Sequence, residues 1–183
     1  MKLVILDRDG VINEDSDHYI RSVDEWIPIP GSIEAIARLN KAGYTIAIAT
    51  NQSGIGRGYY DVAELLAMHD KMIRLVSDYG GSISVIRFCP HTPEVCCDCR
   101  KPAPGLIRQI ESELQISAKG AWLVGDTSKD IEVARISGCR PVLVKTGKGE
   151  ITFKNIADNA LSGVKIVASL ADFADDLLNG ATV

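Results

Sequence analysis

The stretch that decides the fold is K-L-V-I-L-D-R-D-G-V, residues 2–11 of the 183-residue chain. Its apolar run, Leu3–Leu6, is too short to span a membrane but has the length of a strand buried in a parallel sheet. Asp7 ends this run and Asp9 follows two residues later, at the strand end where open α/β sheets bind their ligands. Two carboxylates this close repel each other unless a cation or a shared proton lies between them. The stretch therefore predicts a central strand with an acidic site, with two ordinary loop aspartates as the alternative.

Composition limits the classes of protein to which the chain can belong. Its length and its 46% of hydrophobic residues fit one globular domain over residues 1–183. The formal net charge of −4 argues against a broad surface for nucleic acid or anionic membranes. No apolar stretch has transmembrane length or the pattern of a signal peptide. We therefore expect a cytoplasmic monomer without nucleic-acid or membrane partners, in which the five cysteines are metal ligands or buried thiols and not disulfides.

Strand-like and helix-like segments alternate along the rest of the chain. After a polar loop over residues 11–30, Ser32 predicts the N-cap of a helix through residue 39. Asp61 and Glu64 predict a capping box for a helix reaching about residue 79, and Pro104 predicts the first position of a helix to about residue 116. Further helices are expected to end at residue 136 and to span residues 171–178. Further strands are expected at residues 44–49, 83–88, 121–124, 141–144 and 165–168.

This alternation predicts an α/β fold with a doubly wound, Rossmann-like, mainly parallel sheet covered by helices on both faces. Right-handed crossovers and the usual strand order place the first strand between the second and the fourth. The carboxyl ends of these three strands then lie side by side at one edge of the sheet. We therefore expect Asp7, Thr50 and Asp126 to meet there.

These strand ends supply the groups needed for phosphoryl transfer to a carboxylate. Asp7 can attack phosphorus without prior deprotonation, and Asp9 is placed to protonate the leaving alkoxide and later to activate water. Mg²⁺ held by Asp7, Asp126 and the backbone carbonyl of Asp9 would remove the repulsion between two anions. Thr50 with the amides after it can bind phosphate oxygens, and Lys101 can neutralise the charge that develops on them. Each residue alone has an ordinary structural explanation, but their joint placement at strand ends favours catalysis.

A second group of ligand-type residues follows the third predicted strand. The pattern C-x-H-x5-C-x-C places three thiols and one imidazole within eleven residues, which matches a structural zinc site. The predicted ligands are Cys89, His91, Cys97 and Cys99. Cys96 could replace Cys97, but C-D-C puts two sulfurs on one side of an extended segment and favours Cys97. Zinc would also fix the adjacent catalytic candidates Arg100 and Lys101; buried thiols or a disulfide are the alternatives.

Taken together, these motifs resemble the haloacid dehalogenase superfamily of phosphatases. The matching segments are D-R-D-G-V at residues 7–11, the strand-ending Thr50, Lys101 in R-K-P and G-D-T-S-K-D at residues 125–130. The resemblance implies that Asp7 is the nucleophile and Asp9 the acid and base, that Asp126 binds Mg²⁺, and that Asp130 supports the water shell of the metal. Members often carry a cap domain after the first or the third strand. Here those segments read as loops, so we expect a capless member.

Within the superfamily, the zinc loop followed by C-R-K-P resembles two groups, which act on heptose bisphosphates and on histidinol phosphate. T-N-Q-S-G-I-G-R-G at residues 50–58 and R-K-P-A-P-G at residues 100–105 are similar to the first group. The resemblance therefore implies a small sugar phosphate as substrate, in the synthesis of bacterial lipopolysaccharide precursors. The expected substrate contacts are Asp15, His18, Tyr19, Asn51, Gln52, Ser53, Arg57 and Arg100.

Charge favours the same substrate group. A sugar bisphosphate carries a second anion that Arg57 and Arg100 could meet, whereas histidinol phosphate carries a cationic amine that they would repel. A phospho-accepting receiver module is the alternative from a different functional class, because it also phosphorylates an Asp in a doubly wound sheet. The zinc loop and the second aspartate of the D-x-D pair argue against it.

Overall fold

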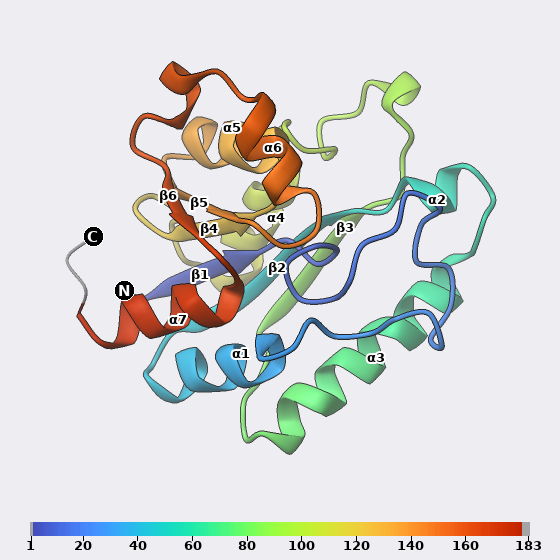
Figure 1. Cartoon of the computed structure of the whole chain (residues 1–183). Coiled ribbons are helices and arrows are strands. Elements are labelled where there is room, and N and C mark those ends of the chain that lie inside the picture. Colours follow the sequence, from blue (N-terminus) through green and yellow to red (C-terminus); the bar gives the residue numbers. More distant parts are fainter. Residues whose placement is uncertain (1, 181–183) are drawn as a thin grey trace.

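A parallel sheet of six strands forms the middle layer of the computed structural model, which describes residues 2–180 (Figure 1). The strand order is β3-β2-β1-β4-β5-β6. The strands are β1 (Leu3–Leu6), β2 (Thr45–Asn51), β3 (Val85–Cys89), β4 (Trp122–Gly125), β5 (Arg140–Val144) and β6 (Lys165–Val167). In the register of the central strand, Leu3 lies opposite Thr45 of β2 and Val4 opposite Trp122 of β4. The predicted doubly wound sheet is confirmed, including the first strand between the second and the fourth.

Helices cover both faces of this sheet (Figure 1). One face packs against α1 (Ser32–Lys41), α3 (Val62–Asp78) and α7 (Leu170–Leu178), and the other against α4 (Gly105–Leu114) and α5 (Ser128–Ile136). In β1, Val4 and Leu6 join the first core cluster, whereas Leu3 and Ile5 join the second. A strand buried on both faces needs apolar residues at every position, which explains the unbroken apolar run.

Two helix starts differ in detail from the sequence-based prediction. The N-cap of α1 is Gly31, with a φ of 80°, and the predicted capping residue Ser32 is the first residue of the helix. The Ser32 hydroxyl instead donates to the carbonyl of Ile12 at 2.6 Å, tying the loop to the helix. Asp61 caps α3 as predicted by accepting from the amide of Glu64 at 2.8 Å. The Glu64 carboxylate, however, accepts from the amide of Val23 in the loop between β1 and α1, so the predicted reciprocal capping box is wrong.

Short elements make up most of the remaining differences. The helices α2 (Ser53–Gly56) and α6 (Gly149–Asn155) and the 3₁₀ turns Pro93–Val95 and Asp158–Leu161 were not predicted, because they are too short to show a hydrophobic period. Pro104 is the N-cap of α4, one position before its predicted place. Residues 7–31 and 90–104, where a cap domain would be inserted, form loops with a single 3₁₀ turn. Among residues 2–180, no helix combines the length and the hydropathy needed to cross a bilayer.

Candidate active site

The carboxyl ends of β1, β2 and β4 bring the predicted catalytic groups to one edge of the sheet. Asp7 follows β1, Thr50 lies near the end of β2, and Asp126 follows β4. Carboxylate oxygens of Asp7, Asp126 and Asp130 lie within 4.8 Å of one another. Asp7, Asp9 and Asp126 line a pocket of about 250 Å³. The fold therefore assembles the acidic site from residues more than a hundred positions apart.

One buried cation lies among these carboxylates. Nζ of Lys101 is 2.9 Å from Oδ2 of Asp7 and 2.6 Å from Oδ1 of Asp130. Burial disfavours the ammonium charge, but the two carboxylates outweigh it and raise the pKa of Lys101 above its usual value. Asn51 fixes the backbone of Lys101: its amide oxygen accepts from the Lys101 N–H at 3.0 Å, and its amide nitrogen donates to the Lys101 carbonyl at 3.1 Å. Asn51, a predicted substrate contact, thus holds the residue that carries the cation.

The site contains more negative charge than Lys101 can balance. Burial is the main cause that raises the pKa of Asp7 to about 7, with Asp130 and Asp9 adding to it and Lys101 opposing it. Burial also raises the pKa of Asp126 to about 8, followed by the charges of Asp7 and Asp130. A divalent cation bound by these hard oxygen ligands would relieve the repulsion between them. The set of donor atoms therefore fits Mg²⁺.

The backbone encloses one oxygen of Asp126. Gly10 and Gly147 have φ values of 79° and 57°, a region that side chains rarely adopt. A Cβ atom would lie 2.1 Å from Oδ2 of Asp126 if added to Gly10, and 2.4 Å from it if added to Gly147. The amide of Lys148 donates to the same oxygen at 2.7 Å, and the Thr146 hydroxyl donates to the Gly10 carbonyl at 2.7 Å. These contacts fix the orientation of the carboxylate.

Asp9 differs from its neighbours because its pKa is lowered. Burial acts in the opposite direction, but the charge and hydrogen bonds of Arg8 and the hydrogen bonds from Asn13 and Gln52 outweigh it. Arg8 is fully buried, with Nη2 2.8 Å from Oδ1 of Asp9. Nδ2 of Asn13 donates to Oδ1 at 2.9 Å, and Nε2 of Gln52 donates to Oδ2 at 2.8 Å. Asp9 is therefore an ionised carboxylate held in one orientation at the pocket wall.

The other predicted contacts fall into two groups. Those that line the pocket are Asp15, Tyr19, Asn51, Gln52, Ser53 and Arg100. His18 and Arg57 do not line it: His18 borders an adjoining hollow, and Arg57 is exposed at the end of α2. Thr50 is fully buried, and its hydroxyl oxygen accepts a hydrogen bond from Gln52 at 2.9 Å.

Several side chains that were not predicted also line the pocket, among them Tyr60, Lys129 and Lys148. Lys148 follows the carboxyl end of β5, so the rule that found the aspartates could also have found it. Lys129 lies within the acidic motif at residues 125–130, next to Asp130. Nothing in the sequence around Tyr60 indicates that the ring turns back to the end of β2.

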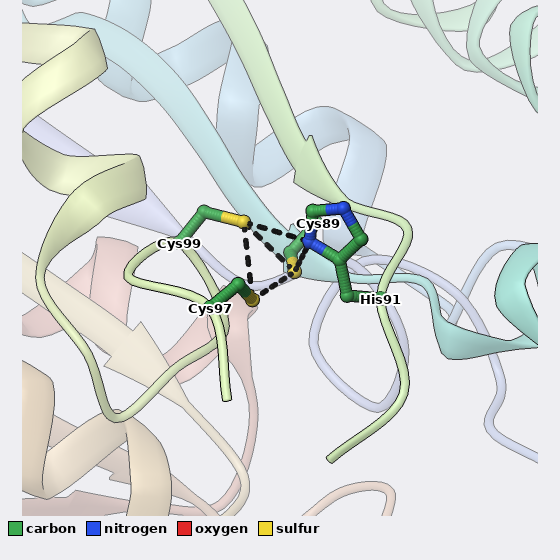
Figure 2. Close-up of side chains that lie close together, drawn as sticks. All are labelled: Cys89, His91, Cys97 and Cys99. Carbon is green, nitrogen blue, oxygen red and sulfur yellow. Dashed lines mark hydrogen bonds between the residues drawn. The ribbon is translucent and has the colours of Figure 1, made fainter. Parts of the chain in front are cut away.

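The four predicted zinc ligands point toward one another (Figure 2). Their sulfur and Nδ1 atoms lie 3.1 Å apart for Cys99 and Cys89, 3.4 Å for Cys99 and Cys97, and 3.4 Å for Cys99 and His91. With Zn–S bonds of about 2.3 Å, sulfurs in a tetrahedral site lie about 3.8 Å apart, so the cluster needs only a small expansion to hold the ion. Cys96 is exposed and lies outside the cluster, so the geometry favours Cys97.

Short links join this cluster to the pocket. Arg100 and Lys101 directly follow Cys99 in the chain, and both line the pocket. Nη1 of Arg100 donates to the carbonyl of His91 at 3.2 Å, which ties the two arms of the loop together. An ordered cysteine loop therefore supports the pocket wall that carries these two cations.

Known proteins match this sequence and this fold. The HAD-hydrolase-like family model matches residues 98–173. A D-glycero-beta-D-manno-heptose-1,7-bisphosphate 7-phosphatase of Pseudomonas putida is 54% identical over 179 residues, which are 97% of this chain and 100% of that protein. The enzyme of the same name from Pseudomonas aeruginosa is 55% identical over 96% of this chain and 97% of its own length.

Solved structures agree with these sequence matches. The D,D-heptose 1,7-bisphosphate phosphatase from B. bronchiseptica, complexed with magnesium and phosphate, is 46% identical with a TM-score of 0.92, over 98% of this chain and 99% of that one. The enzyme from Burkholderia thailandensis is 41% identical with a TM-score of 0.73, over 97% and 99%. The chain belongs to the D-glycero-β-D-manno-heptose-1,7-bisphosphate 7-phosphatase family of the haloacid dehalogenase superfamily.

Proposed function

We propose that the chain is a Mg²⁺-dependent phosphatase that removes the 7-phosphate of D-glycero-β-D-manno-heptose 1,7-bisphosphate, a step toward bacterial lipopolysaccharide. The observation that carries this proposal is the pocket in which Asp7, Asp9, Asp126 and Lys101 meet at the carboxyl edge of the sheet. The match to the heptose phosphatases over nearly the whole chain supports the choice of substrate.

The side chains can divide the reaction between them in two steps. An oxygen of Asp7 forms a bond to phosphorus as the bond to the sugar oxygen breaks. Asp9, which is ionised in the free protein, takes up a proton from solvent as the anionic phosphate binds beside it and gives this proton to the leaving alkoxide. Asp9 then takes a proton from water, which attacks the aspartyl phosphate, releases inorganic phosphate and restores Asp7. Thr50 and Lys101 bind the phosphate oxygens. Mg²⁺ held by Asp7, Asp126 and the carbonyl of Asp9, with Asp130 supporting its water shell, would neutralise the approaching anions.

We also propose that Cys89, His91, Cys97 and Cys99 hold a structural Zn²⁺. The support is the close approach of one nitrogen and three sulfurs, a donor set that zinc binds in a closed tetrahedral site. Closing the loop would keep Arg100 and Lys101 in place. The ion would therefore support catalysis by fixing these side chains and would take no part in the reaction itself.

The cations of the pocket favour a bisphosphate. Lys129 and Arg100 both line it, and Lys129 forms no ion pair within the described part of the chain. Burial and then the charge of Arg100 lower the pKa of Lys129, so an anion between these two side chains would be stabilised. We therefore assign the second phosphate to Arg100 and Lys129 and not to Arg57, which lies outside the pocket. A cationic amine in the same place would be repelled.

Assaying the two substrates side by side tests the assignment. Like-charge contact can cost several kcal/mol, so we expect kcat/KM for the heptose bisphosphate to exceed that for histidinol phosphate by about 10³-fold. Lys129→Met should narrow this ratio, while Arg57→Met, the matched control outside the pocket, should leave it unchanged. A preference for histidinol phosphate would overturn the heptose assignment but not the phosphatase mechanism. Stable phosphorylation of Asp7 without turnover would instead favour a receiver module.

A further inference from the structure

The side-chain amide of Gln52 is fully engaged inside the protein. Gln52 is 3% exposed, and its Nε2 donates to Oδ2 of Asp9 at 2.8 Å and to Oγ1 of Thr50 at 2.9 Å. Its Oε1 accepts from the hydroxyl of Tyr60 at 2.5 Å and from Nη2 of Arg8 at 3.3 Å. An amide has two N–H donors and two acceptor lone pairs, and all four are used here. Gln52 therefore has no hydrogen-bonding group left for a substrate.

The two oxygens of Asp9 are not equivalent. Within residues 2–180, Oδ1 accepts three hydrogen bonds, two from the guanidinium of Arg8 and one from Asn13. Oδ2 accepts one hydrogen bond, from Gln52, and keeps a lone pair. The Asp9 side chain is 22% exposed and borders the pocket. Oδ2 is thus the oxygen that can exchange a proton with a bound substrate.

The bond from Gln52 leaves the hydroxyl proton of Thr50 free. Oγ1 of Thr50 accepts from Gln52, so this proton can still be donated. A phosphate oxygen is an acceptor, which suits the role proposed for Thr50. Thr50 does not need Gln52 in order to donate, so a substitution of Gln52 acts on the reaction through Asp9.

Tyr60 helps to fix which way this amide is turned. Its hydroxyl and the guanidinium of Arg8 both donate to Oε1, so Nε2 faces Asp9; an amide turned the other way would place Oε1 against the carboxylate. The ring of Tyr60 is itself fixed, because it packs so closely on Gly54 that a Cβ atom there would lie 2.2 Å from Cε1 of the ring. Tyr60 can therefore act on Asp9 without touching the reacting atoms.

We propose that Gln52 and Tyr60 are positioning residues that aim Oδ2 of Asp9 at the leaving oxygen, with Tyr60 acting through Gln52. This inference rests on the proposed function. It replaces the earlier expectation that Gln52 contacts the substrate. Misplacing a general acid and base by a fraction of an ångström removes part of the 10²–10⁴-fold that such groups contribute, which would appear in kcat and not in KM.

The test uses Gln52→Leu, Tyr60→Phe, the double variant, and Tyr59→Phe as a matched control that removes one hydroxyl from an exposed neighbour. With the heptose bisphosphate, we expect kcat to fall about 10-fold for Tyr60→Phe and about 100-fold for Gln52→Leu, with KM within about twofold of the wild type. The double variant should match Gln52→Leu, because Tyr60 acts through it. Tyr59→Phe should retain wild-type kinetics.

A second substrate separates positioning from general damage. p-Nitrophenolate leaves without needing a proton. The rate of its release in a single turnover of p-nitrophenyl phosphate should therefore stay within about threefold of the wild type in Gln52→Leu and in Tyr60→Phe. If the single-turnover rate with p-nitrophenyl phosphate fell as much as kcat with the heptose bisphosphate, the substitutions would have damaged the site in general, and the inference would be wrong. A raised KM, or an undiminished Tyr60→Phe effect in the Gln52→Leu background, would show direct substrate contact, and either result overturns the inference. A wild-type protein that hydrolyses neither ester would refute the proposed function itself.

Discussion

Replacing Asp126 with Asn should make the Mg²⁺-free protein more stable, and increasingly so as the pH rises. The Asp126 side chain is 2% exposed, and its carboxylate lies within 4.8 Å of those of Asp7 and Asp130. Burial and these two charges raise its pKa to about 8. An amide of the same shape removes the charge and keeps an oxygen that can accept from the amide of Lys148, which donates to the carboxylate at 2.7 Å.

The size of the effect follows from the pKa shift of Asp126. The carboxyl group titrates near 3.8 in the unfolded chain and near 8 in the folded one. A pKa raised by folding contributes stability that is fully present below about pH 4 and is lost as the pH rises toward 8. One pH unit inside this window corresponds to about 1.4 kcal/mol. Between pH 5 and pH 8, the stabilisation produced by Asp126→Asn should therefore grow by roughly 3–4 kcal/mol.

Urea unfolding in EDTA, followed by circular dichroism at pH 5 and pH 8, measures this difference. Asp24→Asn is the matched control, because Asp24 is exposed and its substitution should change the free energy of unfolding equally at both pH values. Adding Mg²⁺ at pH 8 should stabilise the wild type far more than the Asp126→Asn variant. The reasoning is refuted if this variant is less stable than the wild type at pH 8 in EDTA, or if the difference does not depend on pH.

Three further predictions concern the nucleophile, the zinc loop and a buried histidine. Asp7→Asn should abolish turnover without unfolding the protein, Asp9→Asn should slow both steps, and EDTA should stop the reaction reversibly; an active Asp7→Asn variant would exclude the covalent route. Elemental analysis of protein purified without added metal should find one zinc ion per chain, lost in Cys97→Ser and kept in Cys96→Ser, and the reverse result would reassign the ligand. Burial, followed by the charge of Arg8, lowers the pKa of His69 from 6.5 to about 4, so its contribution to stability is present above about pH 6.5 and lost as the pH falls toward 4. In the wild type, the free energy of unfolding in urea should therefore fall by about 3 kcal/mol over that range because of His69, and His69→Leu should abolish this part of the decrease. A variant with the same pH profile as the wild type would contradict the prediction.

The sheet and the acidic edge could be predicted because their signals are local. A strand buried on both faces is recognised in the sequence as an unbroken apolar run. The first polar residue after this run lies at the carboxyl edge of the sheet. Asp7 and Asp126 needed no knowledge of loop shape to be placed together. The cysteine cluster was equally accessible, since its ligands lie within one short segment.

Positions that depend on packing between loops could not be predicted. Arg57 lies in a glycine-rich segment that was expected to face the substrate. That segment instead forms α2 and bonds to the cysteine loop, where the amide of Gly56 donates to the carbonyl of Pro90 at 3.0 Å. Gln52 was expected to contact the substrate because of the resemblance of residues 50–58, yet the hydroxyl of Tyr60 bonds to its amide inside the protein. Such partners are set by tertiary contacts that no local pattern records.

The enclosure of Asp126 has a consequence for protein synthesis. The glycines that border its carboxylate lie far apart in the sequence, and the hydrogen bond that joins their segments links residues 136 positions apart. A nascent chain emerges from the ribosome with its N-terminal part first. Asp7 and Asp9 are therefore made early, but the enclosure cannot form until Gly147 has been synthesised and β5 has joined the sheet. Chains released before that point cannot complete this enclosure, so hydrolysis should begin only after Gly147 has left the ribosome.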